Sequence, residues 1–221
     1  ETWLLTFLRV AAPIASQLVF LAPVSTMRKI ASEKTCGKIS PLPFSAMVVS
    51  GMTWTTYGFL KENPSIWISN ISAICFGCYY IWVYSRFVEA SDRSGLMNQL
   101  MGAACLIAVV GLCAVILPLV TAIQYIGMIG TGIVVVMFSG PLAAIKTVVR
   151  ERSTQSIPPV FAVASFVNCL LWLGLGVQLE DPFVWFPNGL GLAAAVVQLG
   201  LFGVYGLPRA APRPEAEMAK V

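Results

Sequence analysis

The sequence predicts an all-α integral membrane protein in which seven transmembrane helices form two parallel three-helix bundles joined by a linker helix, a 3+1+3 arrangement. Three observations predict this fold: the composition, seven apolar stretches and an internal repeat. Of the 221 residues, 57% are hydrophobic and 11% are charged, whereas soluble domains carry about 25% charged residues. A water-soluble protein of this size needs more polar surface than such a composition provides.

The apolar stretches have the length of membrane-spanning helices, which need about 20 residues. The predicted spans are Leu5–Met27, Leu42–Leu60, Ile66–Ser85, Gln99–Leu119, Ile123–Ile145, Pro159–Gln178 and Phe183–Gly206. The fourth and fifth spans are expected to be separated only by a short link at Thr121–Gln124.

The chain also repeats itself at a displacement of 118 residues, and the repeat retains scarce residue types. The matched pairs are Pro23/Pro141, Pro41/Pro159, Trp54/Trp172, Gly58/Gly176, Glu62/Glu180, Pro64/Pro182, Trp67/Trp185 and Asn70/Asn188. Spans 1–3 match spans 5–7, and the fourth span reverses the chain once more, so both halves face the same way. A doubled unit of this kind favours a transporter with its site between the halves.

The repeat divides the chain into four predicted parts. Residues 1–86 form the first three-helix repeat, 87–120 a linker loop and the fourth helix, and 121–206 the second repeat. Residues 207–221, rich in proline, alanine and charge, are predicted to be a disordered cytosolic tail.

Basic residues predict the orientation, because cytosolic loops carry an excess of lysine and arginine. If the amino terminus is outside or in a lumen, only Arg9 and Lys61 of the 14 basic residues lie away from the cytosol. We therefore expect the carboxyl terminus in the cytosol. The net charge of +4 comes from short loops, so no nucleic-acid partner is expected.

The duplicated Trp54–Asn70 and Trp172–Asn188 units are the candidate substrate site. Asparagine offers a carbonyl and an amide group, and tryptophan a flat apolar ring with one N–H. Two such units facing each other would bind an uncharged, hydroxylated solute. A single asparagine could instead link helices, and a single tryptophan could anchor the membrane interface, but duplication of the whole unit favours binding. For Trp82, packing or an interfacial role is the better interpretation.

Five short motifs follow one another along the chain: Phe20-Leu-Ala-Pro23 with Thr26 and Arg28-Lys29, Leu42-Pro43-Phe44, Tyr57-Gly58, Ser139-Gly-Pro-Leu142 and Phe186-Pro-Asn-Gly-Leu-Gly191. These motifs resemble those of the SWEET sugar facilitators of the PQ-loop class, and the resemblance extends to about Tyr205. Their order, spacing and duplication make the resemblance specific. SWEET proteins are themselves an established case of parallel repeats, so the repeat and the resemblance are not independent.

The resemblance implies roles for particular residues. It assigns substrate binding to Trp54, Asn70, Trp172 and Asn188, and adds Ser50 and Asn168, for which a packing role is the alternative. It implies an inner gate of Pro23, Pro43, Pro141 and Pro158, although the repeat aligns Pro41 with Pro159 and leaves open which proline of each doublet faces the pathway. Tyr57 and Asp181 resemble an outer gate, with solvated loop polarity as the alternative, above all for Asp181. The resemblance also implies assembly into homo-oligomers.

The prolines can be interpreted without the resemblance as well. Pro23 and Pro141 fall in the last turns of spans 1 and 5, where a missing backbone N–H loosens a helix. A hinge is therefore expected there, with simple helix termination as the alternative.

The predicted function is bidirectional facilitated diffusion of neutral sugars, with monosaccharides favoured, by alternating access. The chain has no histidine, and no Asp or Glu within a span, so no titrating group is evident for ion coupling. The alternatives are a PQ-loop carrier of another small solute, a cargo-sorting receptor or, less favoured, a seven-helix receptor. No enzyme, cofactor or metal site is expected. The bilayer is either the plasma membrane or a vacuolar or other internal membrane.

Overall fold

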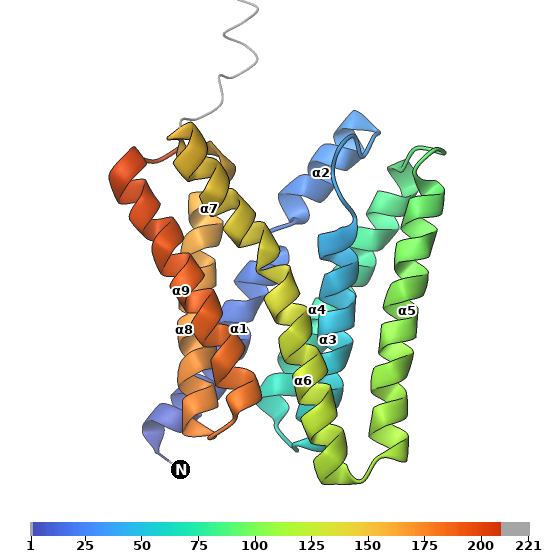
Figure 1. Cartoon of the computed structure of the whole chain (residues 1–221), viewed down its shortest axis with the longest axis vertical. Helices are drawn as coiled ribbons and strands as arrows, with labels where there is room; N and C mark the ends of the chain where they lie inside the picture. The colour runs from blue at the N-terminus through green and yellow to red at the C-terminus, as the bar shows by residue number, and fades with distance from the viewer. Residues whose placement is uncertain (1, 209–221) are drawn as a thin grey trace, which may run out of the picture.

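The computed structural model describes residues 2–208, and most of the predicted tail, 209–221, lies outside the described residues. Within the described part, every regular element is a helix (Figure 1). The elements are α1 (Trp3–Leu21), α2 (Val24–Glu33), α3 (Leu42–Leu60), α4 (Pro64–Phe87), α5 (Arg93–Ile116), α6 (Leu119–Met137), α7 (Ser139–Glu151), the 3-10 turn η1 (Thr154–Ser156), α8 (Pro159–Gln178) and α9 (Pro182–Tyr205).

Seven spans result, because α1 continues into α2 and α6 continues into α7. Six of these spans are long and apolar enough to cross a membrane by length and composition. The seventh is α3, which has the length of a span but contains several serine and threonine residues. The predicted all-α membrane fold is confirmed.

The predicted spans differ from the helices at three places. Span 1 is two helices that meet at Ala22 and Pro23, and span 5 is two helices that meet at Phe138. The predicted link at Thr121–Gln124 is wrong, because these residues lie inside α6. The chain turns instead at Leu117 and Pro118, where the proline cannot continue α5 and forces the preceding residue into an extended conformation.

The repeat is visible in the backbone. Helix α9 begins and ends 118 residues after α4. Among the described residues, four that are not glycine have positive φ, and they form two repeat pairs, Lys34 with Arg152 and Glu62 with Glu180. Since this conformation is uncommon outside glycine, its recurrence at the same displacement shows that both halves use the same turns.

Helix contacts reproduce the predicted pseudo-two-fold relation. In the first bundle (α1–α4), α4 packs against α1 and α3, and in the second bundle (α6–α9), α9 packs against α6 and α8. Between the bundles, α1 contacts α8 and α3 contacts α6. The repeat exchanges α1 with α6 and α3 with α8, so each inter-bundle contact maps onto the other. The linker helix α5 packs on α3 and α6.

The turn between the last two helices of each bundle explains a repeated glycine. Residue Glu62 has φ 51°, and the Asn63 N–H donates to the Gly58 carbonyl at 2.8 Å. The equivalent bond joins Asp181 N–H to the Gly176 carbonyl at 2.9 Å. This six-to-one bond is the Schellman ending of a helix. The turn brings the next helix onto the glycine, which leaves no room for a side chain.

Adding one methyl group at this contact should destabilise the fold. In Gly176→Ala, the new Cβ would lie 2.6 Å from the Trp185 backbone nitrogen. Because backbone cannot move aside cheaply, we expect a loss of about 1–3 kcal/mol and a thermal midpoint lower by several degrees in detergent. Gly200→Ala, which meets open space on α9, is the matched control. Equal midpoints for the two variants would contradict this account.

The core is divided differently at the two ends of the molecule. The Asp181 end contains the α3–α4 and α8–α9 turns, and the Pro23 end contains α2 and α7 (Figure 1). One buried cluster, which includes Leu8, Trp54, Trp172 and Leu175, spans both bundles toward the Asp181 end. At the Pro23 end, one cluster with Met27 belongs to the first bundle and another with Val148 to the second. Among the described residues, the apolar core therefore joins the bundles toward one end only.

Candidate functional site

Trp54 and Trp172 lie where the two bundles meet. Both indoles belong to the cluster that spans the bundles, and their residues are 9% and 7% exposed. Gly130 on α6 makes room for Trp54, because a Cβ there would lie 3.0 Å from two ring atoms. Trp54 also packs edge-on against Tyr57, with ring centroids 5.3 Å apart. Much of each ring surface is therefore covered by protein.

The two indoles differ in their hydrogen bonds. Trp172 Nε1 donates to the Ser16 hydroxyl at 2.8 Å, and the Ser16 hydroxyl lies 2.9 Å from Asn168 Oδ1. Ser16 thus ties α1 of the first bundle to α8 of the second. Its counterpart in the repeat is Val134, which has no polar atom to offer Trp54. Within residues 2–208, the Trp54 N–H has no hydrogen-bond partner.

Ser16 was not among the predicted site residues. The selection rested on duplicated polar positions, and Ser16 has an apolar counterpart. The sequence does contain a signal, because Ser16 is a small polar residue inside an apolar span. The structure shows that this serine is buried, at 4% exposure.

Asn70 and Asn188 have the same geometry in the two bundles. Asn70 Nδ2 donates to the Ile66 carbonyl and Asn188 Nδ2 to the Val184 carbonyl, both at 2.8 Å. Because only the amide nitrogen can donate to a carbonyl, each Oδ1 is turned away from its own helix and can accept a bond. Neither Oδ1 has a partner in the described part of the chain, and both residues are half-buried.

Ser50 and Asn168 are repeat partners with different surroundings. Asn168 Oδ1 is engaged with Ser16, whereas Ser50 is half-buried and has no hydrogen-bond partner in the 2–208 region. The structure therefore assembles Asn168, Ser16 and Trp172 into one network across the interface. Ser50 stays outside it.

Tyr57 and Asp181 meet across the bundles at the Asp181 end. The Tyr57 hydroxyl lies 2.8 and 2.7 Å from the two carboxylate oxygens of Asp181. Lys61 Nζ lies 3.4 Å from Oδ2, and Asp181 Oδ1 also accepts the Phe183 N–H at the start of α9. Asp181 is only 1% exposed, and a carboxylate so deeply buried needs partners of this kind. We name Tyr57, Lys61 and Asp181 the clamp.

The clamp exists in one copy. The counterparts of Tyr57 and Asp181 are Leu175 and Asn63. Asn63 keeps the local role of Asp181, since its side chain caps α4 by accepting the Ser65 N–H at 3.2 Å. Leucine cannot donate a hydrogen bond, so no second clamp forms on the other side of the pseudo-two-fold axis.

The four predicted gate prolines all lie at the Pro23 end. Pro23 is the N-cap of α2, and Pro141 lies in the first turn of α7. Pro43 and Pro158 are exposed at the beginnings of α3 and α8. Pro23 and Pro141 therefore sit at or just after helix junctions, where the chain changes course. That these junctions act as hinges stays a prediction.

A buried side chain supports the backbone near each junction. The Tyr80 hydroxyl donates to the Phe20 carbonyl at 2.7 Å. The repeat counterpart of Tyr80 is Gln198, whose amide lies 3.5 Å from the Pro141 carbonyl. Both repeats thus place a polar side chain of the last helix against the backbone near the junction, with the shorter contact in the first bundle.

Cysteine and acidic residues do not gather into a ligand set in residues 2–208, where no group of three or more could hold a metal ion. Cys75 and Cys78 are exposed on α4. Cys36 lies in the loop before α3, and burial raises the pKa of its thiol, with Glu89 adding to the effect.

A family model described as "Sugar efflux transporter for intercellular exchange" matches residues 6–92 and 124–210, two ranges that begin 118 residues apart. "Bidirectional sugar transporter SWEET11" of Arabidopsis thaliana is 30% identical over 100% of this chain and 78% of its own length. "Sugar transporter SWEET1" of Drosophila pseudoobscura pseudoobscura is 31% identical over 90% of this chain and 88% of its own. A solved structure of a eukaryotic SWEET transporter superposes with a TM-score of 0.86 at 24% identity, covering 91% of this chain and 96% of that one.

Proposed function

We propose, from the premise that this chain belongs to the SWEET family of sugar transporters, that it moves neutral sugars across a membrane in both directions by alternating access. The observation that carries the proposal is the unequal joining of the bundles. At the Asp181 end, a shared apolar cluster and the clamp hold the bundles together, whereas at the Pro23 end each bundle has its own cluster. A carrier needs a closed end of this kind that can open while the other end closes.

The chemistry of the candidate residues supports a neutral, hydroxylated substrate. The unengaged acceptor oxygens of Asn70 and Asn188, the Trp54 N–H and the Ser50 hydroxyl are all uncharged. A sugar can donate to the two amide oxygens and accept from the indole, while its C–H face contacts the ring. A charged amino or carboxylate group would find no opposite charge among these residues. Bulky residues at the matching ends of α1 and α6, Val19 and Phe20 in the first repeat and Met137 and Phe138 in the second, favour a monosaccharide over a disaccharide.

The direct test is flux. Proteoliposomes containing the purified chain should take up labelled glucose or fructose faster than sucrose, and loaded proteoliposomes should release the sugar when the gradient is reversed. Protein-free liposomes are the control. Binding without flux would instead favour a cargo-sorting or other receptor, and would contradict the carrier proposal.

We propose that the movement is uniport, driven only by the sugar gradient. The chain has no histidine, and the buried acidic residue of the clamp, Asp181, is matched by Lys61 and Tyr57. An imposed pH difference across the liposome, with equal sugar on both sides, should therefore produce no net accumulation of labelled glucose. Accumulation against the gradient, abolished by a protonophore, would sink the uniport proposal but not the carrier proposal.

We further propose that the Pro23 end faces the cytosol. Arg28, Lys29, Lys34, Arg86 and Lys146 support this orientation, because they lie in or beside the segments that form this end. In intact cells, an impermeant maleimide should label a cysteine placed at Lys61 and not one placed at Lys146. The opposite pattern would reverse the orientation.

Cross-linking of the same membranes tests assembly into homo-oligomers, which the family resemblance implies. A purely monomeric protein would contradict this expectation.

A further inference from the structure

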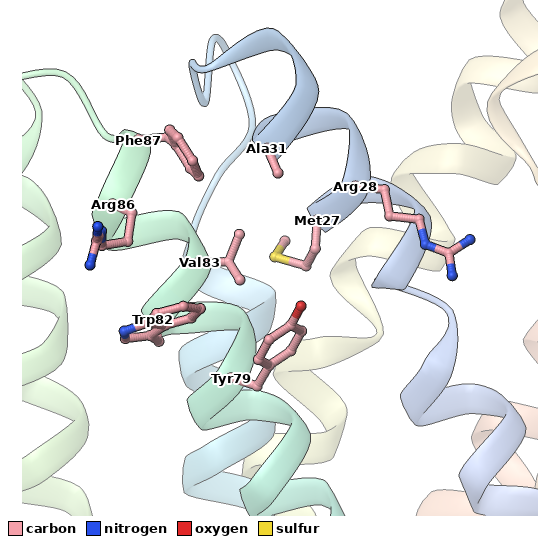
Figure 2. A pocket seen from close by; sticks show the side chains of 8 residues that line it. All are labelled: Met27, Arg28, Ala31, Tyr79, Trp82, Val83, Arg86 and Phe87. Carbon is pink, nitrogen blue, oxygen red and sulfur yellow. The ribbon is translucent and has the colours of Figure 1, made fainter.

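A groove on the outer face of the first bundle is separate from the interface where the candidate sugar site lies. It runs between α2 and α4 at the Pro23 end, has a volume of about 310 Å³, and is drawn with its eight lining side chains in Figure 2. Met27 and Val83 are buried, at 2% and 6% exposure. The volume is at the lower end of the range of small-molecule sites, about 300–1,000 Å³.

An aromatic surface borders the groove on α4. Tyr79 and Trp82 are 50% and 57% exposed, and their rings stack at 6.2 Å with an interplanar angle of 29°. The Arg86 guanidinium lies over the Trp82 ring, 5.8 Å from its centroid. Large exposed rings beside an arginine in the last turn of a spanning helix are typical of the membrane–water interface.

The surroundings of the groove are positively charged. Arg86 and Arg28 are lining residues that project to opposite sides (Figure 2), and Lys34 Nζ lies 5.3 Å from the centroid of the lining residue Phe87. Three carboxylates are near in sequence. Glu33 contacts Lys29 at 3.9 Å, Glu89 lies 3.5 Å from the Thr35 hydroxyl, and Asp92 precedes α5. None of the three lines the groove.

The second repeat forms the same helices without these residues. The counterparts of Tyr79, Trp82 and Arg86 are Val197, Gly200 and Val204, whereas the counterpart of Arg28 is the basic Lys146. The fold therefore does not need an aromatic and cationic surface at this place. The exposed aromatic and cationic surface beside this groove is therefore specific to the first repeat, and its chemistry suits a ligand with an anionic group and an apolar chain.

We propose that this groove binds one anionic phospholipid of the surrounding membrane. The lipid phosphate contacts the Arg86 guanidinium, and one acyl chain lies along Trp82 and Tyr79 toward Met27. Arginine pairs well with phosphate, and basic residues near a membrane surface attract anionic lipids by about 1 kcal/mol each. Because α2 begins at the Pro23 junction and packs against α4, a lipid in this groove holds α2 in place. The proposal requires only that the chain spans a membrane, not that it carries sugar.

Native mass spectrometry of the full chain in detergent, titrated with phosphatidylglycerol or phosphatidylcholine of equal chain length, tests the proposal. We expect tighter binding of phosphatidylglycerol. Arg86→Gln should weaken that binding by about fivefold, the factor that corresponds to about 1 kcal/mol for one arginine. Soluble glycerophosphate at the same concentration should not compete, because it lacks the acyl chain.

Lys146→Gln is the matched control, because it removes an exposed cation from the same end of the second bundle. It should leave phosphatidylglycerol binding unchanged. Trp82→Leu, which keeps an apolar side chain on the helix, should weaken binding of both lipids. Three results would each overturn the proposal: equal binding of the two lipids, no effect of Arg86→Gln, or the same loss of binding in Lys146→Gln. Because Arg86→Gln is a mild substitution, these results can be distinguished from misfolding.

Discussion

Replacing Asn70 or Asn188 by alanine should reduce the initial rate of sugar uptake by about tenfold or more, and replacing both should abolish it. Each substitution removes a half-buried acceptor oxygen that the protein leaves unengaged. A sugar hydroxyl left without its partner costs about 1–3 kcal/mol, a factor of about 5 to 150. The measurement is uptake of labelled glucose into proteoliposomes that contain equal amounts of each variant.

Asn98→Ala on the exposed face of α5 controls for the loss of an amide as such. This variant should transport normally, and all variants should keep the thermal midpoint of the parent within a few degrees. If Asn70→Ala and Asn188→Ala both retained flux, these residues would not form the substrate site. Flux lost together with thermal stability would instead indicate a structural role for the amides.

Removing the Tyr57 hydroxyl should open the Asp181 end. Tyr57→Phe leaves the buried Asp181 carboxylate with Lys61 and a backbone N–H as its partners. A hydrogen bond to a charged group contributes about 1.5–3 kcal/mol, so the balance between closed and open forms of this end should shift by a factor of about 10 to 150. Flux should fall, because a carrier that cannot close one end cannot complete its cycle.

Spin labels at Phe59 and Val177 report on this opening, since these exposed repeat partners lie on α3 and α8 near the Asp181 end. The native exposed cysteines Cys75, Cys78 and Cys105 must first be replaced. Tyr57→Phe should move the distance distribution to longer values. An unchanged distribution would show that the clamp does not hold the two bundles together.

Two further substitutions divide the clamp into its parts. Asp181→Asn introduces the residue that the first repeat has at this position, Asn63, and so keeps the helix cap while removing the charge. It should have a smaller effect than Tyr57→Phe, because an amide oxygen still accepts from the phenol. Lys61→Gln should have the smallest effect, since the lysine is more than one third exposed and such pairs contribute about 1 kcal/mol or less.

The two halves share a backbone but not a set of polar contacts. Ser16 corresponds to Val134, Tyr57 to Leu175 and Tyr80 to Gln198. The first repeat thus provides the interface hydroxyl, the phenol of the clamp and the shorter contact near the helix junction. We infer that the two bundles contribute unequally to closing the Asp181 end and to moving at the Pro23 end.

The sequence alone was sufficient to predict the membrane fold, the spans and the parallel repeat. Span length and composition are local properties of the chain, and the scarce residues at a displacement of 118 appear in the sequence without any knowledge of contacts. Two helices, α3 and α8, begin and end where the apolar stretches predicted. The turn at Pro118 was not predicted correctly, because apolar residues continue across it. Helix breaks were expected at Pro23 and Pro141, and the structure has them at Ala22 and Pro23 and at Phe138, three residues before Pro141.

The tertiary structure decided which end is closed and, apart from the Tyr57–Asp181 pair that the family resemblance had proposed as an outer gate, which residues meet across the bundles. Ser16 and Trp172 are 156 residues apart, and Tyr57 and Asp181 are 124 residues apart. Neither separation equals the repeat displacement, so the duplication that identified the asparagines and tryptophans could not reveal these contacts. They depend on how α1 packs on α8 and how α3 meets the start of α9, and such packing between distant helices has no periodic signal in the sequence.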